Sequence, residues 1–171
     1  MILSDYDIKR MLKAKKMEIH PLNPAQIGSA SVDLTLSKEW YFFKKSCYGK
    51  VFDLKKTSFK NAFEKKNKKE VVLKPGEMCL GKTVEKIRLP SYIMGKLEGR
   101  SRYARMGLII HTTSALVQPG SNNHQILEIV NLSPFPIRIH AGMRVSQVVF
   151  QLLEHPTTKP YAKFGQIAKN Q

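Results

Sequence analysis

The strongest constraint on the fold is a series of short apolar runs that recur between turn-forming residues along most of the chain. Within 31–43 the apolar residues Val32, Leu34 and Leu36 alternate with polar ones, the period of a half-buried strand. Further runs of this kind lie at 71–73, 78–83, 93–97, 108–111, 125–130, 137–140 and 145–153. Several short strands at turn-marked spacing predict a mainly β chain, an all-β barrel or jelly roll.

One short helix is expected before the strands, over residues 4–16. Ser4 can cap it, Asp5 and Asp7 suit the positive end of the helix dipole, and lysines close it. Ile8, Met11 and Leu12 fall on one face. The total of 171 residues suits one domain over 1–171 rather than two.

Composition limits the setting of the protein. The only cysteines, Cys47 and Cys79, stand far apart, which excludes a disulfide scaffold and a multi-cysteine zinc module and favours a reducing cytoplasm. No apolar run approaches the roughly 20 residues of a membrane span, and the start of the sequence lacks the pattern of a signal peptide. We therefore expect a cytoplasmic protein without a membrane partner.

The charge is strongly positive and unevenly distributed. Lys and Arg number 29 against 13 Asp and Glu, a formal charge of +16, which favours anionic partners such as nucleotides, nucleic acid or acidic membranes. Eleven lysines lie in 44–74 with three acids, Asp53, Glu64 and Glu70. Because aromatic residues at stacking spacing with glycine or arginine are missing there, we interpret this lysine-rich excursion as a solvated face between strands. Nucleic acid is not an expected partner.

The type of cation changes after Glu98. Between 99 and 158 every basic residue other than histidine is an arginine, at positions 100, 102, 105, 138 and 144, and the remaining carboxylates are Glu128 and Glu154. The rigid guanidinium fork suits bidentate contacts with phosphate or carboxylate, although plain surface arginine is an equal alternative.

Glu128 is the most informative single residue, because it interrupts the apolar run 125–130, where a strand would hold it against the core. A charge in that position needs a partner. It is either half of a buried ion pair, with Arg105 as a candidate, or a carboxylate poised for proton transfer. Strand alternation that turned the side chain outward would end both interpretations.

Two short polar segments could line a pocket. Residues 99–102 place a glycine before three polar donors just after an expected strand and could cradle a phosphate, although an ordinary turn is the commoner meaning of such a pattern. Residues 111–114 follow an apolar run, and we expect His111 to be a satisfied structural histidine. The sequence has no zinc-deaminase motif, Walker loop or dinucleotide-binding glycine fingerprint.

Taken together, these residues resemble the dCTP deaminase branch of the dUTPase superfamily over most of the chain outside the lysine-rich excursion. The N-terminal half matches through Leu3-Ser4-Asp5-x-Asp7-Ile8 and Ala30-Ser31-Val32-Asp33-Leu34-x-Leu36. The C-terminal half matches through Gly99-Arg100-Ser101-x-x-Ala104-Arg105-x-Gly107-Leu108-x-x-His111-x-Thr113, Pro119-Gly120, Leu127-Glu128-x-x-Asn131, Pro136-Ile137 and Gly142-Met143.

The resemblance implies a distorted β-barrel or jelly roll of the dUTPase-like type with a short N-terminal helix. It also implies a homotrimer with active sites between subunits. The implied reaction is the zinc-independent hydrolysis of the cytosine amino group of dCTP to dUTP and ammonia. No metal is expected on protein ligands, and Mg²⁺ accompanies the triphosphate.

The resemblance also assigns roles by motif position. Glu128 would be the general base and proton shuttle, while Arg105 and Ser101 would hold the water and Glu128. Arg100, Ser101 and Arg102 would face the phosphates, and Thr113 and Ser114 would line the base pocket. The remaining nucleotide contacts would come from the tail 155–171, through Tyr161, Lys163 and Gln166.

Gln118 stands where the family normally has an aspartate. A glutamine amide can hydrogen-bond a sugar hydroxyl but cannot act as a base, so its presence favours deamination over cleavage of the triphosphate. The alternatives are a dUTP diphosphatase, alone or combined with deamination, and a catalytically silent nucleotide-binding member of the family.

Overall fold

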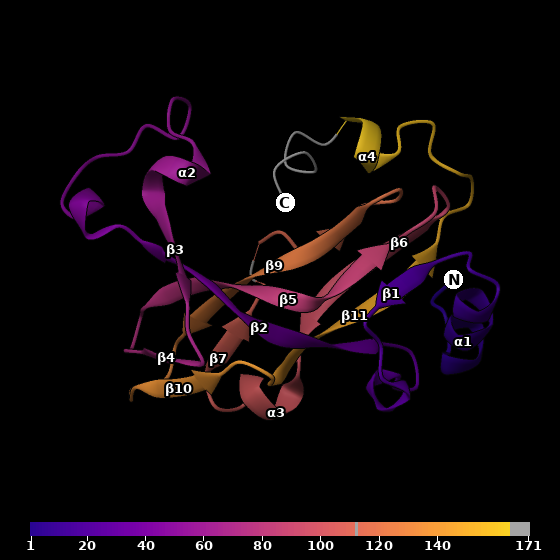
Figure 1. Cartoon of the computed structure of the whole chain (residues 1–171), viewed down its shortest axis with the longest axis horizontal. Coiled ribbons are helices and arrows are strands. Elements are labelled where there is room, and N and C mark those ends of the chain that lie inside the picture. Colours follow the sequence, from indigo (N-terminus) through magenta and orange to yellow (C-terminus); the bar gives the residue numbers. More distant parts are fainter. Residues whose placement is uncertain (112, 165–171) are drawn as a thin grey trace.

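The computed structural model describes residues 1–111 and 113–164, and in it a curled β-sheet forms the centre of the molecule (Figure 1). The path through this sheet is β7-β9-β5-β2-β11-β6-β8, with β1 beside β5 and β3 beside β2, and a separate ribbon pairs β10 with β4. The strands are Glu18–His20 (β1), Val32–Phe43 (β2), Phe63–Asn67 (β3), Glu70–Leu73 (β4), Met78–Arg88 (β5), Ile93–Gly99 (β6), Leu108–Ile110 (β7), Leu116–Val117 (β8), Asn122–Asn131 (β9), Ile137–His140 (β10) and Arg144–Leu152 (β11). The mainly β prediction is confirmed.

The helices are short and lie outside the sheet. They are Asp5–Lys13 (α1), Phe59–Ala62 (α2), Ser101–Ala104 (α3) and Tyr161–Phe164 (α4), with 3₁₀ turns at Pro24–Gln26 and Lys45–Cys47. Within the described part of the chain, no helix is both long and apolar enough to cross a membrane.

The N-terminal helix forms where the sequence predicted it. Ser4 Oγ accepts a hydrogen bond from the Asp7 amide, and the Asp7 carboxylate accepts one from the Ser4 amide, a reciprocal cap. Ile8 is fully buried beneath the helix. The helix ends at Lys13, three residues before the expected end, and Lys15 has a positive φ of 53°.

Strand alternation fills the core. Val32, Leu34 and Leu36 of β2 are buried together with Trp40, whose indole Nε1 donates to the Lys68 carbonyl over 3.0 Å. The lysine-rich excursion is more ordered than the sequence indicated, because β3 pairs with β2 and β4 pairs with β10. The expectation that the whole of 44–74 is a solvated connection is therefore wrong at its C-terminal end, where Val71 and Leu73 enter the core.

A buried polar network lies where β5 changes register against its two neighbours. The β2–β5 pairing shifts between Leu36 and Trp40, and the β5–β9 pairing shifts between Lys82 and Lys86. There the Glu85 carboxylate accepts from Gln26 Nε2 over 2.7 Å and from the Thr35 amide over 2.8 Å. The side chain thus replaces ladder hydrogen bonds that the irregular register cannot form, which allows the sheet to bend.

Glu85→Gln tests this network. The carboxylate is 2% exposed and each of its oxygens accepts from a different donor, so an amide would turn an NH₂ group toward one donor. We expect the free energy of unfolding in urea to fall by about 1–3 kcal/mol. The matched control is Glu98→Gln, which removes an exposed ion pair with Lys96 and should change stability by less than about 0.5 kcal/mol. Equal losses in the two variants would contradict the assignment.

Candidate functional site

Glu128 lies on β9 with its side chain on the face opposite the core. Its neighbours Leu127 and Ile129 are fully buried, while Glu128 itself is half-buried. The expectation that the strand holds this carboxylate against the core is therefore wrong, because successive side chains of a strand point to opposite faces. Glu128 nevertheless remains partly shielded from solvent, and the segment after β7 packs beside it.

Thr113 holds the Glu128 carboxylate. Its hydroxyl lies 3.0 Å from Oε1 and 2.8 Å from Oε2, and its amide donates to Oε2 over 3.2 Å. The amide of His111 donates to the Glu128 carbonyl over 2.9 Å, which extends the β7–β9 ladder by one residue. Side chain and backbone of Glu128 are thus both tied to the segment that follows β7, and the carboxylate is oriented before any ligand arrives.

His111 is the unexpected member of this group. It has a positive φ of 54°, and both ring nitrogens are buried without a hydrogen-bond partner among residues 1–111 and 113–164. Burial lowers the pKa of the imidazole, while the charge of Glu128 acts in the opposite direction. The expected satisfied structural histidine is not found within the described residues. Its strained backbone was not readable from the sequence.

Arg100 is held by the protein itself. Its Nε lies 3.2 Å from Asp33 Oδ1, and Nη1 donates to the Arg144 carbonyl over 3.0 Å. Burial raises the pKa of Asp33, and the charges of Arg100 and Arg144 oppose that shift. Arg100 therefore joins the end of β6 to β2 and β11, a role that the spacing of the motif did not indicate.

The other polar residues of the 99–105 motif are exposed. Ser101 and Arg102 lie on α3, and Arg105 follows it in the turn before β7. Glu128 faces the opposite end of β7, about 10 Å away along three strand residues. In Figure 1, α3 lies at the lower edge of the molecule and β9 above it.

A third group lies at the turn that precedes β9. The amides of Tyr161 and Ala162 donate to the carbonyls of Pro119 and Gly120 over 2.9 and 3.3 Å, so α4 is seated on this turn. A Cβ added to Gly120 would lie 2.6 Å from Pro160 Cβ, which shows how closely the two segments pack.

The remaining predicted contacts are exposed or cannot be placed. Gln118, Ser114 and Lys163 are exposed, and Gln166 lies outside the described residues. The structure therefore unites Glu128 with Thr113 but leaves the α3 group and the α4 group apart. In the described part of the chain, no cluster of three or more His, Cys, Asp or Glu side chains could hold a metal.

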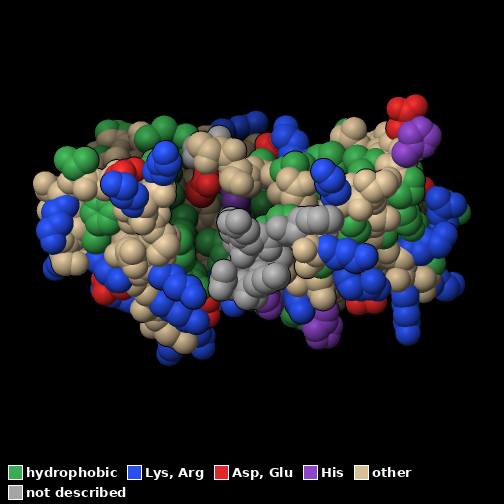
Figure 2. Space-filling model, turned by 90° about the horizontal axis from the view of Figure 1, so that it is seen from above, with side chains coloured by type: hydrophobic (Ala, Val, Ile, Leu, Met, Phe, Trp, Pro, Cys, Tyr) green, Lys and Arg blue, Asp and Glu red, His purple; other side chains and the backbone are tan. Residues whose placement is uncertain are grey.

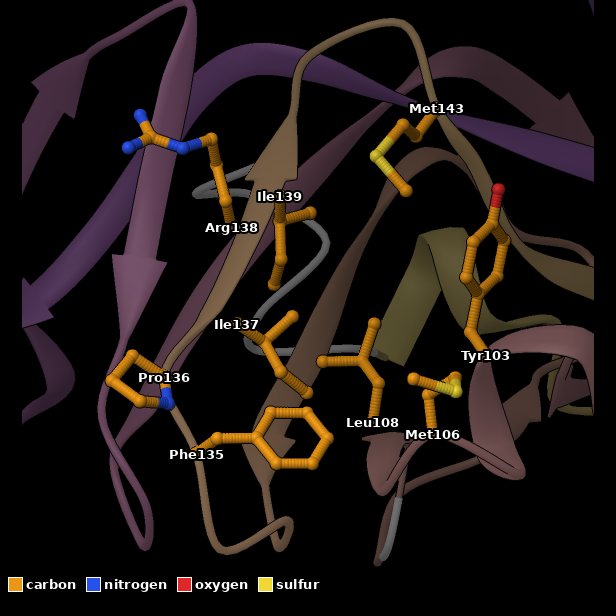
Figure 3. A pocket seen from close by; sticks show the side chains of 9 residues that line it. All are labelled: Tyr103, Met106, Leu108, Phe135, Pro136, Ile137, Arg138, Ile139 and Met143. Atoms are coloured by element: carbon orange, nitrogen blue, oxygen red, sulfur yellow. The ribbon is translucent and has the colours of Figure 1, made fainter.

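An apolar hollow of about 280 Å³ adjoins α3, between β7 and β10 (Figure 3). Tyr103, Met106 and Phe135 contribute to its wall, and Met106 and Phe135 are largely exposed. The guanidinium of Arg138 points away from the apolar side chains and pairs with Glu70 on β4. This arginine supports the β10–β4 ribbon, and the hollow lacks the polar groups that would orient a nucleotide.

The pKa of His111 gives a direct test of the carboxylate–imidazole arrangement. We expect its NMR titration midpoint to lie below the ordinary value of 6.5, and Glu128→Gln to lower it further because a raising charge is removed. A histidine whose folded pKa is depressed binds protons more readily when unfolded, so its contribution to stability is present above pH 6.5 and declines as the pH falls toward the folded pKa. An unchanged midpoint in the Glu128→Gln variant would show that the two side chains do not interact.

Comparison with known proteins places this geometry in a family. The dCTP deaminase-like family profile matches residues 2–153. The dUMP-forming dCTP deaminase of Dictyoglomus turgidum is 36% identical over 95% of this chain and 86% of its own length, and the dCTP deaminase of Natronomonas pharaonis is 35% identical over 94% and 85%.

Solved structures agree on the fold. The 2′-deoxycytidine 5′-triphosphate deaminase of Agrobacterium tumefaciens has a TM-score of 0.66 and 21% identity, and the match covers 96% of this chain but 53% of that one. The dUTPase of Staphylococcus bacteriophage 80alpha has a TM-score of 0.53 and 17% identity over 84% of this chain and 94% of its own. The chain thus has a dUTPase-like fold and belongs to the dCTP deaminase-like family.

Proposed function

We propose that this protein hydrolyses the amino group of dCTP, releasing ammonia and dUTP. The observation that carries the proposal is the Glu128 carboxylate, oriented by the amide and hydroxyl of Thr113 and partly shielded from solvent. Relatives at about one-third identity that carry the name dCTP deaminase support the substrate. The free cysteines suit a reducing cytoplasm.

The chemistry requires one group that both accepts and donates a proton. Neutral water attacks C4 of the cytosine ring poorly, so Glu128 takes a proton from the water as hydroxide adds to C4. The protonated carboxylic acid then transfers this proton to the ring nitrogen, and collapse of the tetrahedral carbon expels the amino group as ammonia. Water supplies the oxygen of the new carbonyl group, so the reaction balances as dCTP plus water to dUTP plus ammonia.

A second subunit would complete the site. Ser101 and Arg105 lie at the opposite end of β7 from Glu128 and face solvent, where they could meet the β9 face of a neighbouring copy. The apolar hollow beside α3, with the exposed Met106 and Phe135, gives that surface the apolar character of a subunit contact. We therefore propose a closed homotrimer in which Glu128 of one chain works with Ser101 and Arg105 of the next.

Magnesium would enter with the substrate. The described residues offer no cluster of acidic or histidine ligands, whereas a triphosphate has the hard oxygen atoms that Mg²⁺ prefers. The ion would neutralise phosphate charge, and Arg102 and Lys163 would contact the remaining phosphate oxygens. We propose that the reaction needs no zinc.

The product is the finer part of the proposal. Several relatives, including that of Dictyoglomus turgidum, are named dUMP-forming, which makes dUMP the second candidate product. The Gln118 amide cannot take a proton from the water that would cleave the triphosphate, so we favour dUTP.

Incubation of the purified protein with dCTP and Mg²⁺ tests the reaction and its product. We expect ammonia and dUTP in equal amounts, without pyrophosphate, and unchanged turnover after dialysis against a zinc chelator followed by return of Mg²⁺. Release of dUMP and pyrophosphate would favour the second candidate. A nucleotide-induced rise in melting temperature without any product would indicate a silent binding protein and refute the proposal.

Glu128→Gln isolates the proposed base. Loss of acid–base help should lower kcat by about 10²–10⁴-fold, while dCTP still raises the melting temperature of the variant. Glu154→Gln removes an exposed carboxylate elsewhere and should leave turnover unchanged. Turnover near the wild-type level in Glu128→Gln would exclude this residue as the base.

Subunit complementation tests the shared site. Arg105→Ala and Glu128→Gln should each be inactive alone, but randomly mixed trimers should regain activity at about a quarter of their sites, where both native residues meet. Mass spectrometry would establish that mixed trimers had formed. Failure of such trimers to recover activity would place the whole site within one chain.

A further inference from the structure

The feature that the proposed function leaves unused is the lysine-rich excursion, residues 44–74. Its eleven lysines and three acids give it half of the chain's formal charge of +16. In Figure 1 the loop and α2 project from one end of the molecule, and in Figure 2 blue Lys and Arg side chains share that end with exposed hydrophobic side chains. A surface that combines these two kinds of group differs from an ordinary solvated face.

Three phenylalanines form a stack at the base of the excursion. Phe43 and Phe63 are register partners on β2 and β3, with ring centroids 4.3 Å apart. Phe59 of α2 lies 4.8 Å from Phe63 with an interplanar angle of 17°. The outer residues remain open, since Phe43 is 40% exposed and Phe59 is 49% exposed. An aromatic stack exposed at its ends can take a further flat ring.

A hollow of about 520 Å³ adjoins this stack. It is lined by Lys44, Lys45, Ser46, Glu64 and Lys66, and Lys44 directly follows Phe43 in the chain. Lys66 is paired with Glu64 at 2.7 Å, and Lys44 Nζ donates to the Lys60 carbonyl over 2.9 Å. Within the described ranges neither Lys44 nor Lys45 has a carboxylate in ion-pair contact. Two ammonium groups are therefore available to an anion beside an exposed ring.

We propose that the lysine-rich excursion binds single-stranded nucleic acid, with one base stacked on Phe43 and the adjoining phosphates on Lys44 and Lys45. Alternating aromatic faces and cations match the alternating bases and phosphates of an unpaired strand. A duplex hides the faces of its bases, so it offers the stack nothing. The sequence argued against this partner because no aromatic spacing suited stacking, but the fold brings together rings that lie far apart in the chain.

Fluorescence anisotropy with a labelled 20-nucleotide oligo-dT tests the proposal on the full-length protein. Lys44→Gln/Lys45→Gln should weaken binding at least about tenfold and reduce the slope of log Kd against log salt by about 1.4, the value for two lost phosphate contacts. Phe43→Leu keeps an apolar side chain without a ring face and should weaken binding about tenfold. The charge-matched control, Lys13→Gln/Lys16→Gln, lies at the end of α1 and should change the affinity less than twofold.

Three results would overturn the proposal. One is the absence of oligo-dT binding at 50 mM salt by the wild-type protein. Another is an equal loss in the α1 control, which would show that net charge alone acts. The third is Lys44/Lys45-dependent binding to phosphatidylserine vesicles without oligo-dT binding, because the exposed Val51 and Leu54 of the loop could enter a lipid surface. Turnover of dCTP should be unchanged in every variant, so failure of the proposed enzyme activity would be a separate result.

Discussion

The alternation of β9 is the constraint on which the candidate site depends. Leu127 and Ile129 are buried in the core, so the residue between them must face the other way. That geometry places a carboxylate next to Thr113 and His111 without the cost of burying a charge in the core. A shift of one residue in register would bury Glu128 and expose both apolar neighbours, so packing of the core fixes the position of the site.

The polar network around Glu85 supports that constraint from the other side of the sheet. β5 pairs with both β2 and β9, and its register changes against each of them. Thr83 receives the Gln125 amide of β9, while Glu85 receives the Thr35 amide of β2. One short polar segment thus joins both neighbours through the bend, and the curl of the sheet and the position of β9 are set together.

The positive charge serves two different purposes on this chain. Arginines of the C-terminal half are held in defined geometry, as with Arg100 on Asp33 and Arg138 on Glu70. Lysines of the excursion project around an exposed aromatic stack and have long, flexible side chains. A rigid fork suits fixed contacts within the fold, whereas mobile point charges suit an extended polyanion whose sequence does not matter. The two halves of the molecule therefore differ in cation type for a physical reason.

The sequence by itself determined the strand pattern, the cap of α1 and the singular position of Glu128, because periodicity and capping are local properties of neighbouring residues. Only the tertiary structure decided which face Glu128 occupies, that Asp33 takes the guanidinium of Arg100, and that Phe43 meets Phe63. It also revealed the strained, unpartnered His111 within the described residues. Those features depend on pairings between distant segments, which local sequence rules do not contain.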